Sequence, residues 1–168
     1  MTKVIVFGAT GAIGTSLVEL LSSEHADWEI LPVTRSVKGT SRLASMNLPN
    51  VTMVEGDPLD KESVLKFTAD CDIVYRCIGF QYERKYWAKH WPIVIENLLA
   101  VLKQDSTSGS MQKKRLVFCD NLYAYGPGEN ISPTSSTIAP SNKSKPAIRA
   151  QVREMMVQHM NQYPGTLT

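Results

Sequence analysis

The sequence has little that would tie it to a membrane or to nucleic acid. No apolar run reaches the roughly 20 residues that a membrane-spanning helix needs. Eighteen Lys and Arg residues are nearly balanced by 16 Asp and Glu, giving a formal net charge of +2, and the basic residues are scattered along the chain. We therefore expect no nucleic acid and no membrane as a partner.

Cysteine is also scarce, with only Cys71, Cys77 and Cys119 in the chain. Their number is odd, none belongs to a CxxC motif, and each lies in or beside an apolar run, where cysteine usually behaves as a small hydrophobic side chain. This pattern argues against a disulfide framework and a metal site, and it favours a reducing compartment. Because the first strand pattern begins near the third residue, it leaves no room for a cleaved signal, and we expect a cytoplasmic chain.

The 168 residues, 43% of them hydrophobic, suffice for a single domain over residues 1–168 with one core. Strand and helix patterns alternate along it. Strand patterns occupy residues 4–7, 29–34, 51–55, 72–77 and 115–119, and helix patterns occupy residues 12–23, 60–68, 87–103 and 145–162. Parallel strands need crossover connections, so the alternation predicts an α/β fold, a doubly wound parallel sheet with helices on both faces. Ligands of such sheets bind at the carboxyl ends of the strands.

Residues 126–146 form a polar stretch that is too long for an ordinary connection between two elements. It is rich in Ser, Thr, Asn and proline. Loops of this length are usually functional lids or disordered segments. We therefore expect a long polar loop here.

The most informative motif is a glycine-paced turn directly after the first strand pattern. It reads Gly8-Ala9-Thr10-Gly11-Ala12-Ile13-Gly14. The apolar residues that follow are spaced to bury one face of a helix, and they are Ile13, Leu17, Val18, Leu20 and Leu21. In such a context the glycines allow a tight turn, a close approach of a pyrophosphate and close helix packing, while the helix amides bind the phosphates.

This motif predicts a dinucleotide site, and the alternative is a purely structural strand-turn-helix. The predicted cofactor-binding residues are Gly8, Thr10, Gly11, Ala12, Ile13 and Gly14.

The residue after the second strand pattern indicates which dinucleotide binds. Arg35 lies about twenty residues beyond Gly14, where an acidic residue would bind the ribose hydroxyl of NAD. An arginine there favours NADP over NAD, because its guanidinium can bind a 2′-phosphate, with Lys38 or Arg42 as helpers. The alternative is an arginine on a solvated loop.

Several motifs together resemble a known family. The run Gly8 to Gly14, the run Gly56-Asp57-Pro58-Leu59 and the run Asn121-Leu122-Tyr123-Ala124-Tyr125-Gly126 are similar to extended or atypical short-chain dehydrogenase/reductases. Three further segments are similar to the NAD-dependent epimerase/dehydratase group in particular. They are Cys77-Ile78-Gly79-Phe80-Gln81-Tyr82, Trp91-Pro92 and Asp120-Asn121. The resemblance spans nearly the whole chain but matches only the amino-terminal, cofactor-binding part of that family. Its members continue with a sixth strand and a substrate-binding region, so we expect a longer natural polypeptide or a truncated paralogue.

The resemblance implies a NAD(P) cofactor, and an oxidoreductase, epimerase or dehydratase that acts on a hydroxyl or carbonyl group of a small molecule. It also implies that Asp57 contacts the adenine amino group, and that Cys77, Ile78 and Gly79 line the nicotinamide side of the groove. For Asp57 the alternative is an aspartate that caps a turn or a helix.

The chain departs from this family in its catalytic motif. Family members use a tyrosine followed four residues later by a lysine that lowers the pKa of the phenol. Alignment instead gives Asn121 at the usual serine, Lys143 at the tyrosine and Ala147 at the lysine, so this relay is absent.

Substitutes for the missing relay lie nearby. Asn121 can hold a substrate oxygen, Tyr125 or Tyr123 can donate a proton, and Lys143 or Lys145 can supply a positive charge. The structural alternatives are a turn cap for the asparagine, packing for the tyrosines and a solvated loop for the lysines.

Two hypotheses of function follow from these observations. The first is a NAD(P)-dependent oxidoreductase or epimerase, and the second is a catalytically silent NAD(P)-binding sensor or scaffold. The helix pattern at residues 87–103 also has an apolar face, which either covers the sheet or joins two copies in a homodimer.

Overall fold

Strands and helices alternate along the chain in the computed structural model, which describes residues 1–37, 42–107, 114–127, 130–132 and 134–167. The strands are β1 (Lys3–Phe7), β2 (Glu29–Thr34), β3 (Val54–Glu55), β4 (Ile73–Arg76) and β5 (Arg115–Phe118). The helices are α1 (Ala12–Glu24), α2 (Arg42–Ser45), α3 (Lys61–Thr68), α4 (Arg84–Thr107), the 3₁₀-helix η1 (Leu122–Tyr125) and α5 (Lys145–Gln162). The predicted α/β fold is confirmed.

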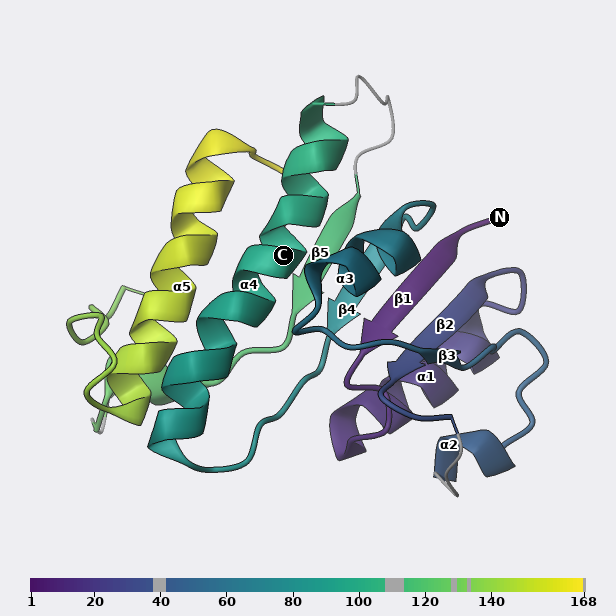
Figure 1. The fold of residues 1–168 in the computed structure, drawn as a ribbon, viewed down its shortest axis with the longest axis horizontal. Coiled ribbons are helices and arrows are strands. Elements are labelled where there is room, and N and C mark those ends of the chain that lie inside the picture. Colours follow the sequence, from purple (N-terminus) through teal and green to yellow (C-terminus); the bar gives the residue numbers. More distant parts are fainter. Residues whose placement is uncertain (38–41, 108–113, 128–129, 133, 168) are drawn as a thin grey trace.

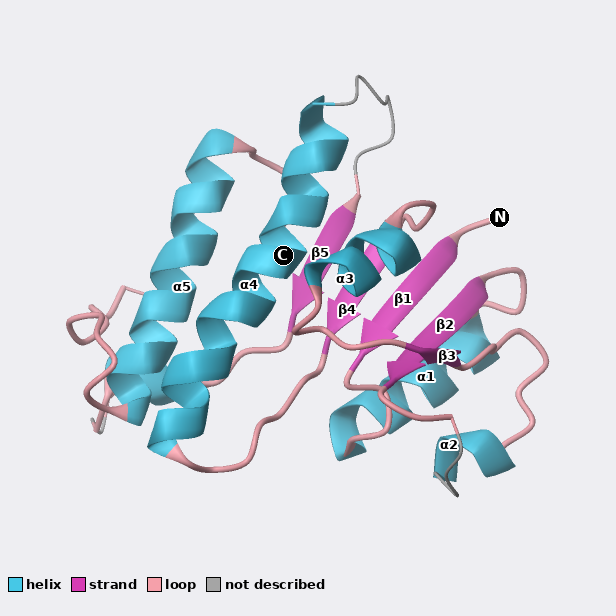
Figure 2. Cartoon of the chain, viewed as in Figure 1, coloured by secondary structure: helices cyan, strands magenta, loops and turns pink. Residues whose placement is uncertain are grey.

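The described strands form one parallel sheet of five strands in the order β3-β2-β1-β4-β5. Val4 of β1 pairs with Ile30 of β2 on one side and with Ile73 of β4 on the other. The order of the strands therefore reverses between β1 and β4. Figure 2 shows the arrowheads pointing toward the same edge of the sheet. A switch point at the carboxyl edge is where sheets of this class bind ligands.

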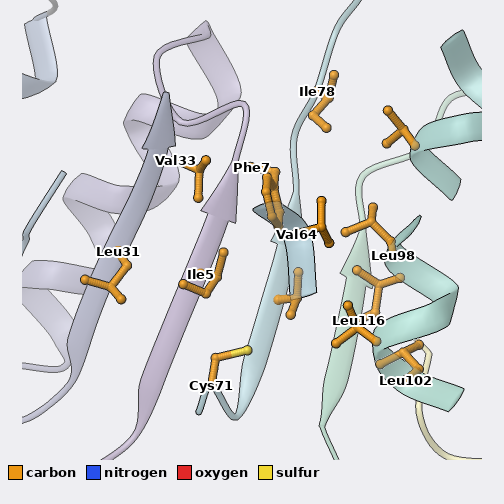
Figure 3. Close-up of a cluster of buried hydrophobic side chains, with 13 residues drawn as sticks. Ile5, Phe7, Leu31, Val33, Val64, Cys71, Ile78, Leu98, Leu102 and Leu116 are labelled. Carbon is orange, nitrogen blue, oxygen red and sulfur yellow. The ribbon is translucent and has the colours of Figure 1, made fainter. Parts of the chain in front are cut away.

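Helices cover both faces of the sheet. Figure 1 shows α3 and α4 on one side and α1 and α2 on the other, with α5 alongside α4. The core under α3 and α4, seen in Figure 3, includes Ile5, Phe7, Val64, Leu98 and Leu116. The core under α1 and α2 is built from Val4, Val6, Val18, Ile30 and Leu43, with others. A third cluster joins α4 to α5.

The apolar face of α4 is buried inside the chain. Trp91, Val94, Leu98 and Leu102 are each at most 3% exposed and pack against the sheet, α3 or α5. Of the two uses expected for this face, the packing role is confirmed, whereas the homodimer stays a prediction.

The first helix buries a different stripe from the one expected. Ile13 and Leu20 are 59% and 57% exposed, while Gly14, Val18 and Leu21 are buried. The glycine and the small Thr15 beside it let the helix lie close to the sheet, so the buried stripe passes through them. The expectation that Ile13 and Leu20 face the core is wrong for this reason.

Other differences concern short elements. The pattern at residues 51–55 yields only Val54–Glu55 as strand, with an isolated bridge between Val51 and Ile30. The helix α4 extends beyond its expected ends at residues 87 and 103, and neither α2 nor η1 has a clear sequence pattern. The described part of residues 126–144 contains no helix or strand, whereas residues 145 and 146, the last two of the expected loop, belong to α5.

The outer edge of β5 is paired near the end of the chain. The amide of Leu116 donates to the carbonyl of Thr166 at 2.8 Å, and Leu167 forms a parallel bridge with Leu116. This pairing lies where the expected fold has its sixth strand. In the described part of the chain, no helix is both long enough and apolar enough to cross a membrane.

Candidate functional site

A cavity of about 680 Å³ lies at the carboxyl edge of the sheet. Its size falls within the range of small-molecule sites, roughly 300–1,000 Å³. Its walls come from the segments that follow β1, β2, β3 and β4, with Tyr86 added from α4. Among the predicted cofactor residues, those that line it are Gly8, Thr10, Gly11, Arg35, Asp57, Cys77, Ile78 and Gly79.

The three glycines of the turn have different surroundings. Gly8 has a φ of +79°, and a Cβ there would lie 2.6 Å from the carbonyl carbon of Cys77. A Cβ on Gly14 would lie 2.2 Å from the carbonyl oxygen of Gly8. A Cβ on Gly11 would meet only that same oxygen, at 3.4 Å. Gly8 and Gly14 are thus required for the backbone to pack, whereas Gly11 has room for a side chain at the cavity wall.

The first turn of α1 has no acidic residue and no side-chain cap of its own. Gly11 is the N-cap and supplies no capping side chain, and no acidic residue lies in the first turn. Free amides and an uncompensated dipole attract a phosphate group. Gly8 and Gly11 line the cavity. The predicted residues Ala12, Ile13 and Gly14 belong to the first turn of α1 and do not line it.

Arg35 lies at the cavity wall directly after β2. It is exposed, and it has no hydrogen-bond or ion-pair partner among the residues that the structure describes. The strand ends in Thr34, whose hydroxyl bonds to the backbone of Ser36. Glu55 of β3 is in register with Thr34, and its Oε2 accepts from the amide of Val37 at 3.5 Å. Of the two expected helpers, Arg42 pairs with Glu19 at 3.4 Å, and Lys38 lies outside the described residues.

Asp57 lies at the cavity and also holds a turn. It lines the cavity after β3, and its Oδ1 accepts a hydrogen bond from the amide of Leu59 at 2.9 Å. Its own amide donates to the hydroxyl of Ser63 at 3.2 Å. The turn role is therefore confirmed, and the contact with adenine stays a prediction.

The segment after β4 forms the far wall of the cavity. Besides Cys77, Ile78 and Gly79, the side chains of Phe80, Gln81 and Tyr86 reach it. Phe80 packs against Tyr86 with 5.6 Å between ring centroids. Phe80 and Gln81 belong to the run that carries the family resemblance, but sequence reasoning gave none of these three residues a site role, although a position after a strand's carboxyl end was the available signal.

None of the predicted catalytic residues lines this cavity. Asn121 is the N-cap of η1, and its Oδ1 accepts from the amide of Tyr123 at 3.1 Å, which is the capping role given as its alternative. Tyr125 is half-buried in the same turn. The Nζ of Lys145 donates to the backbone carbonyl of Tyr82 at 3.1 Å. It also lies 2.9 Å from the centroid of the Tyr82 ring.

The tyrosines close to Lys145 are Tyr82 and Tyr123. The hydroxyls of Tyr82 and Tyr123 are 2.9 Å apart, and this hydrogen bond raises the pKa of Tyr123, while the charge of Lys145 opposes the rise. Trp87 packs edge-on against both tyrosine rings. Tyr82 thus contacts both Lys145 and Tyr123, and it joins the two in one cluster.

Two buried arginines hold the segment after β5. Arg149 of α5 pairs with Asp120, and Arg76 donates to the carbonyl of Cys119 at 2.7 Å. Both guanidinium groups stack on Trp91, with 4.0 and 4.5 Å from Cζ to the ring centroid. Burial, and then the charge of Arg149, lower the pKa of Arg76 to about 9. Sequence reasoning missed this cluster because its members come from separate elements.

With this geometry in view, comparison with known proteins assigns a family. The sequence model of the NmrA-like family matches residues 1–89, which is more than half of the chain. The chain belongs to the NmrA-like family. No curated protein sequence is significantly similar to this NmrA-like chain.

Solved structures with the same fold include enzymes of the epimerase and dehydratase type. A dTDP-glucose 4,6-dehydratase from Bacillus anthracis in complex with NAD is 16% identical with a TM-score of 0.77, and the match covers 99% of this chain and 53% of that one. A UDP-glucuronic acid 4-epimerase from Bacillus cereus in complex with NAD is 16% identical with a TM-score of 0.75, with 99% and 55% covered. A uronate dehydrogenase from Agrobacterium tumefaciens is 17% identical with a TM-score of 0.73, with 97% and 57% covered.

These matches confirm, at the level of the fold, the resemblance to the NAD-dependent epimerase/dehydratase group. The NmrA-like chain spans between 53% and 57% of the length of these three solved structures.

Proposed function

We propose that the chain binds a nicotinamide dinucleotide in the cavity at the carboxyl edge of its sheet, as the cofactor-binding part of a protein of short-chain dehydrogenase or epimerase type. The observation that carries the proposal is the glycine turn, in which Gly8 and Gly14 leave no space for a Cβ. This close packing puts the uncapped end of α1 beside the cavity. The fold shared with NAD-bound dehydratases and epimerases supports the same function.

The residues present fit the parts of such a cofactor. Thr10, Gly11 and the first turn of α1 would hold the pyrophosphate, and Asp57 would face the adenine. The segment from Cys77 to Gly79 would border the nicotinamide. When bound, the cofactor supplies hydride transfer, and the protein orients it.

For the choice of cofactor we propose NADP rather than NAD. The two complexes named above contain NAD, which supports a nicotinamide cofactor in general. The preference for NADP rests on Arg35, which lies at the cavity wall, has no partner among the described residues, and follows a strand that ends in threonine. A free guanidinium there is suited to a 2′-phosphate.

The second candidate function is a catalytically silent NAD(P)-binding sensor or scaffold. It is favoured by one observation, that Asn121 caps a turn and Lys145 lies on Tyr82 while neither lines the cavity. A NAD(P)-dependent enzyme acting on a small molecule is favoured by the fold that the chain shares with dehydratases and epimerases. Nucleotide binding is common to both candidates.

Calorimetric titration with NADPH and NADH tests the proposal. We expect NADPH to bind more tightly than NADH, and Gly11→Val to abolish binding because its side chain would point into the cavity while leaving the fold intact. Arg35→Asp should weaken NADPH binding by about tenfold to a hundredfold, the effect of losing one or two charge-assisted hydrogen bonds.

The matched control for Arg35 is Arg115→Asp, which changes the same charge at the amino end of β5, away from the cavity. This variant should bind NADPH as the wild type does. A folded wild-type chain that binds neither nucleotide would contradict the proposal. Equal loss in the Arg35 and Arg115 variants would contradict the role of Arg35.

A further inference from the structure

Two of the three cysteines directly follow the ends of neighbouring parallel strands. Arg76 of β4 is in register with Phe118 of β5, and the amide of Cys119 donates to the carbonyl of Arg76 at 3.1 Å. This bond belongs to the last pair of the ladder. Cys77 and Cys119 are the residues that directly follow this pair on the two strands, at the carboxyl edge, and each acts on the other electrostatically.

The two side chains point to the same face of the sheet. Side chains alternate along a strand, and Val74 and Leu116 belong to the core under α4. Tyr75 packs with the opposite core, under α1, so Cys77 two residues later shares its face. Cys119 lies three residues beyond Leu116 and so faces the same side as Cys77. Both thiols are free and half-buried, so solvent reaches them.

Cys77 is also part of the nucleotide cavity. It lines the wall of the cavity. A Cβ added to Gly8 would lie 2.6 Å from the carbonyl carbon of Cys77. The backbone at Cys77 and the first glycine of the turn are thus in close contact. A movement of Cys77 toward β5 would loosen the support of that turn.

We propose that Cys77 and Cys119 form a reversible intramolecular disulfide that weakens nucleotide binding. Neighbouring strands lie about 4.8 Å apart, which is within the Cα separation of disulfides, about 4.4–6.8 Å. Their Cβ atoms must come within about 3.5–4.5 Å, so the strand ends have to approach slightly. The effect on binding rests on the proposed function, whereas formation of the disulfide does not.

The reaction needs a small disulfide such as oxidised glutathione. The thiolate of one cysteine attacks a glutathione sulfur, forming a mixed disulfide and releasing one glutathione thiolate. The thiolate of the other cysteine then displaces the second glutathione, and the two protons from the cysteine thiols go to the two glutathione molecules. The protein loses two electrons and the glutathione disulfide gains them. Burial, and then the neighbouring Cys119, raise the pKa of Cys77, which slows its own attack.

Cys71 provides a matched control. Its side chain is 2% exposed, its Sγ donates to the carbonyl of Thr68 at 3.2 Å, and burial raises its pKa to about 12. We therefore expect it to stay reduced.

The test treats the full chain with oxidised glutathione and maps its peptides by mass spectrometry without reduction. We expect a linked Cys77–Cys119 peptide, and a loss of NADPH affinity of roughly tenfold that a dithiol reverses, within the usual range of coupling between two sites. The Cys119→Ser variant should bind NADPH as the wild type does, and the oxidant should neither link its peptides nor lower its NADPH affinity. The Cys71→Ser variant should respond to the oxidant as the wild type does.

Absence of the linked peptide, or a linked chain that binds NADPH as tightly as the reduced chain, would overturn the inference. A reduced chain that fails to bind NADPH while the linked peptide still forms would contradict the proposed function and support the disulfide. The two failures are therefore distinguishable.

Discussion

At the scale of single residues, the three glycines of the turn show how similar positions serve different purposes. Sequence spacing identifies all three as one motif. The structure separates Gly8 and Gly14, which have no room for a methyl group, from Gly11, which has room and borders the cavity. Stability and binding should therefore respond to different members of the same motif.

Replacement of Gly14 by alanine should destabilise the fold. The added Cβ would lie 2.2 Å from the carbonyl oxygen of Gly8, and backbone atoms must shift to relieve the overlap. We expect the free energy of unfolding in urea, followed by tryptophan fluorescence, to fall by at least about 1–3 kcal/mol, the usual cost of overpacking.

Gly79→Ala is the matched control, because its Cβ would meet nothing within 4 Å. Its stability should stay within about 0.5 kcal/mol of the wild type, as for a surface substitution. A Gly14→Ala variant as stable as the Gly79 variant would contradict this account of the turn.

At the scale of elements, the end of α5 is joined to the edge of the sheet through a buried histidine. His159 is 7% exposed, and its Nε2 lies 3.4 Å from the hydroxyl of Thr166. The carbonyl of Thr166 accepts from the amide of Leu116 in β5. The sequence predicts the helix with its bounds, but nothing in the helix pattern indicates that this histidine faces inward.

Burial lowers the pKa of His159 in the folded chain below its ordinary value of 6.5. Between that lowered value and about 6.5, the unfolded chain binds more protons than the folded chain, so stability falls as the pH falls through this window. The neutral side chain contributes its full stabilising effect above the window. We expect the free energy of unfolding to decrease on acidification.

His159→Gln should flatten this dependence, as measured by urea unfolding at a series of pH values from about 7.5 down to about 5. Thr166→Val keeps the burial of His159 and should retain the slope. An unchanged slope in the His159 variant would show that another group is responsible.

At the scale of the whole molecule, the parallel sheet gathers distant segments at one edge. The glycine turn and Arg35 were predicted as cofactor residues from their places after strand patterns, whereas Asp57 and residues 77–79 came from the family resemblance. Gly8, Thr10, Gly11, Arg35, Asp57 and residues 77–79 line one cavity. These residues meet because the carboxyl ends of parallel strands share an edge whatever the strand order, and their role in binding a cofactor stays a prediction. The order β3-β2-β1-β4-β5 was not itself specified by the sequence reasoning.

The positions of the candidate catalytic residues in the fold could not be predicted in the same way. Asn121 caps η1 and Lys145 begins α5, and their positions depend on how η1 packs against α5 and how α5 packs against α4. The contact of Lys145 with Tyr82, and the pairing of Arg149 with Asp120, join segments that no local pattern relates. Long-range packing of this kind leaves no periodic signal in a single sequence.

The most direct test of the central claim is an NMR titration of the isotope-labelled chain with NADPH. If the cavity is the nucleotide site, the amide signals that shift most should belong to residues 8–14, to Arg35, to Asp57 and to residues 77–79, and Gly11→Val should abolish the shifts. Shifts concentrated on α5 or at the amino edge of the sheet, or no shifts in a folded chain, would contradict the account.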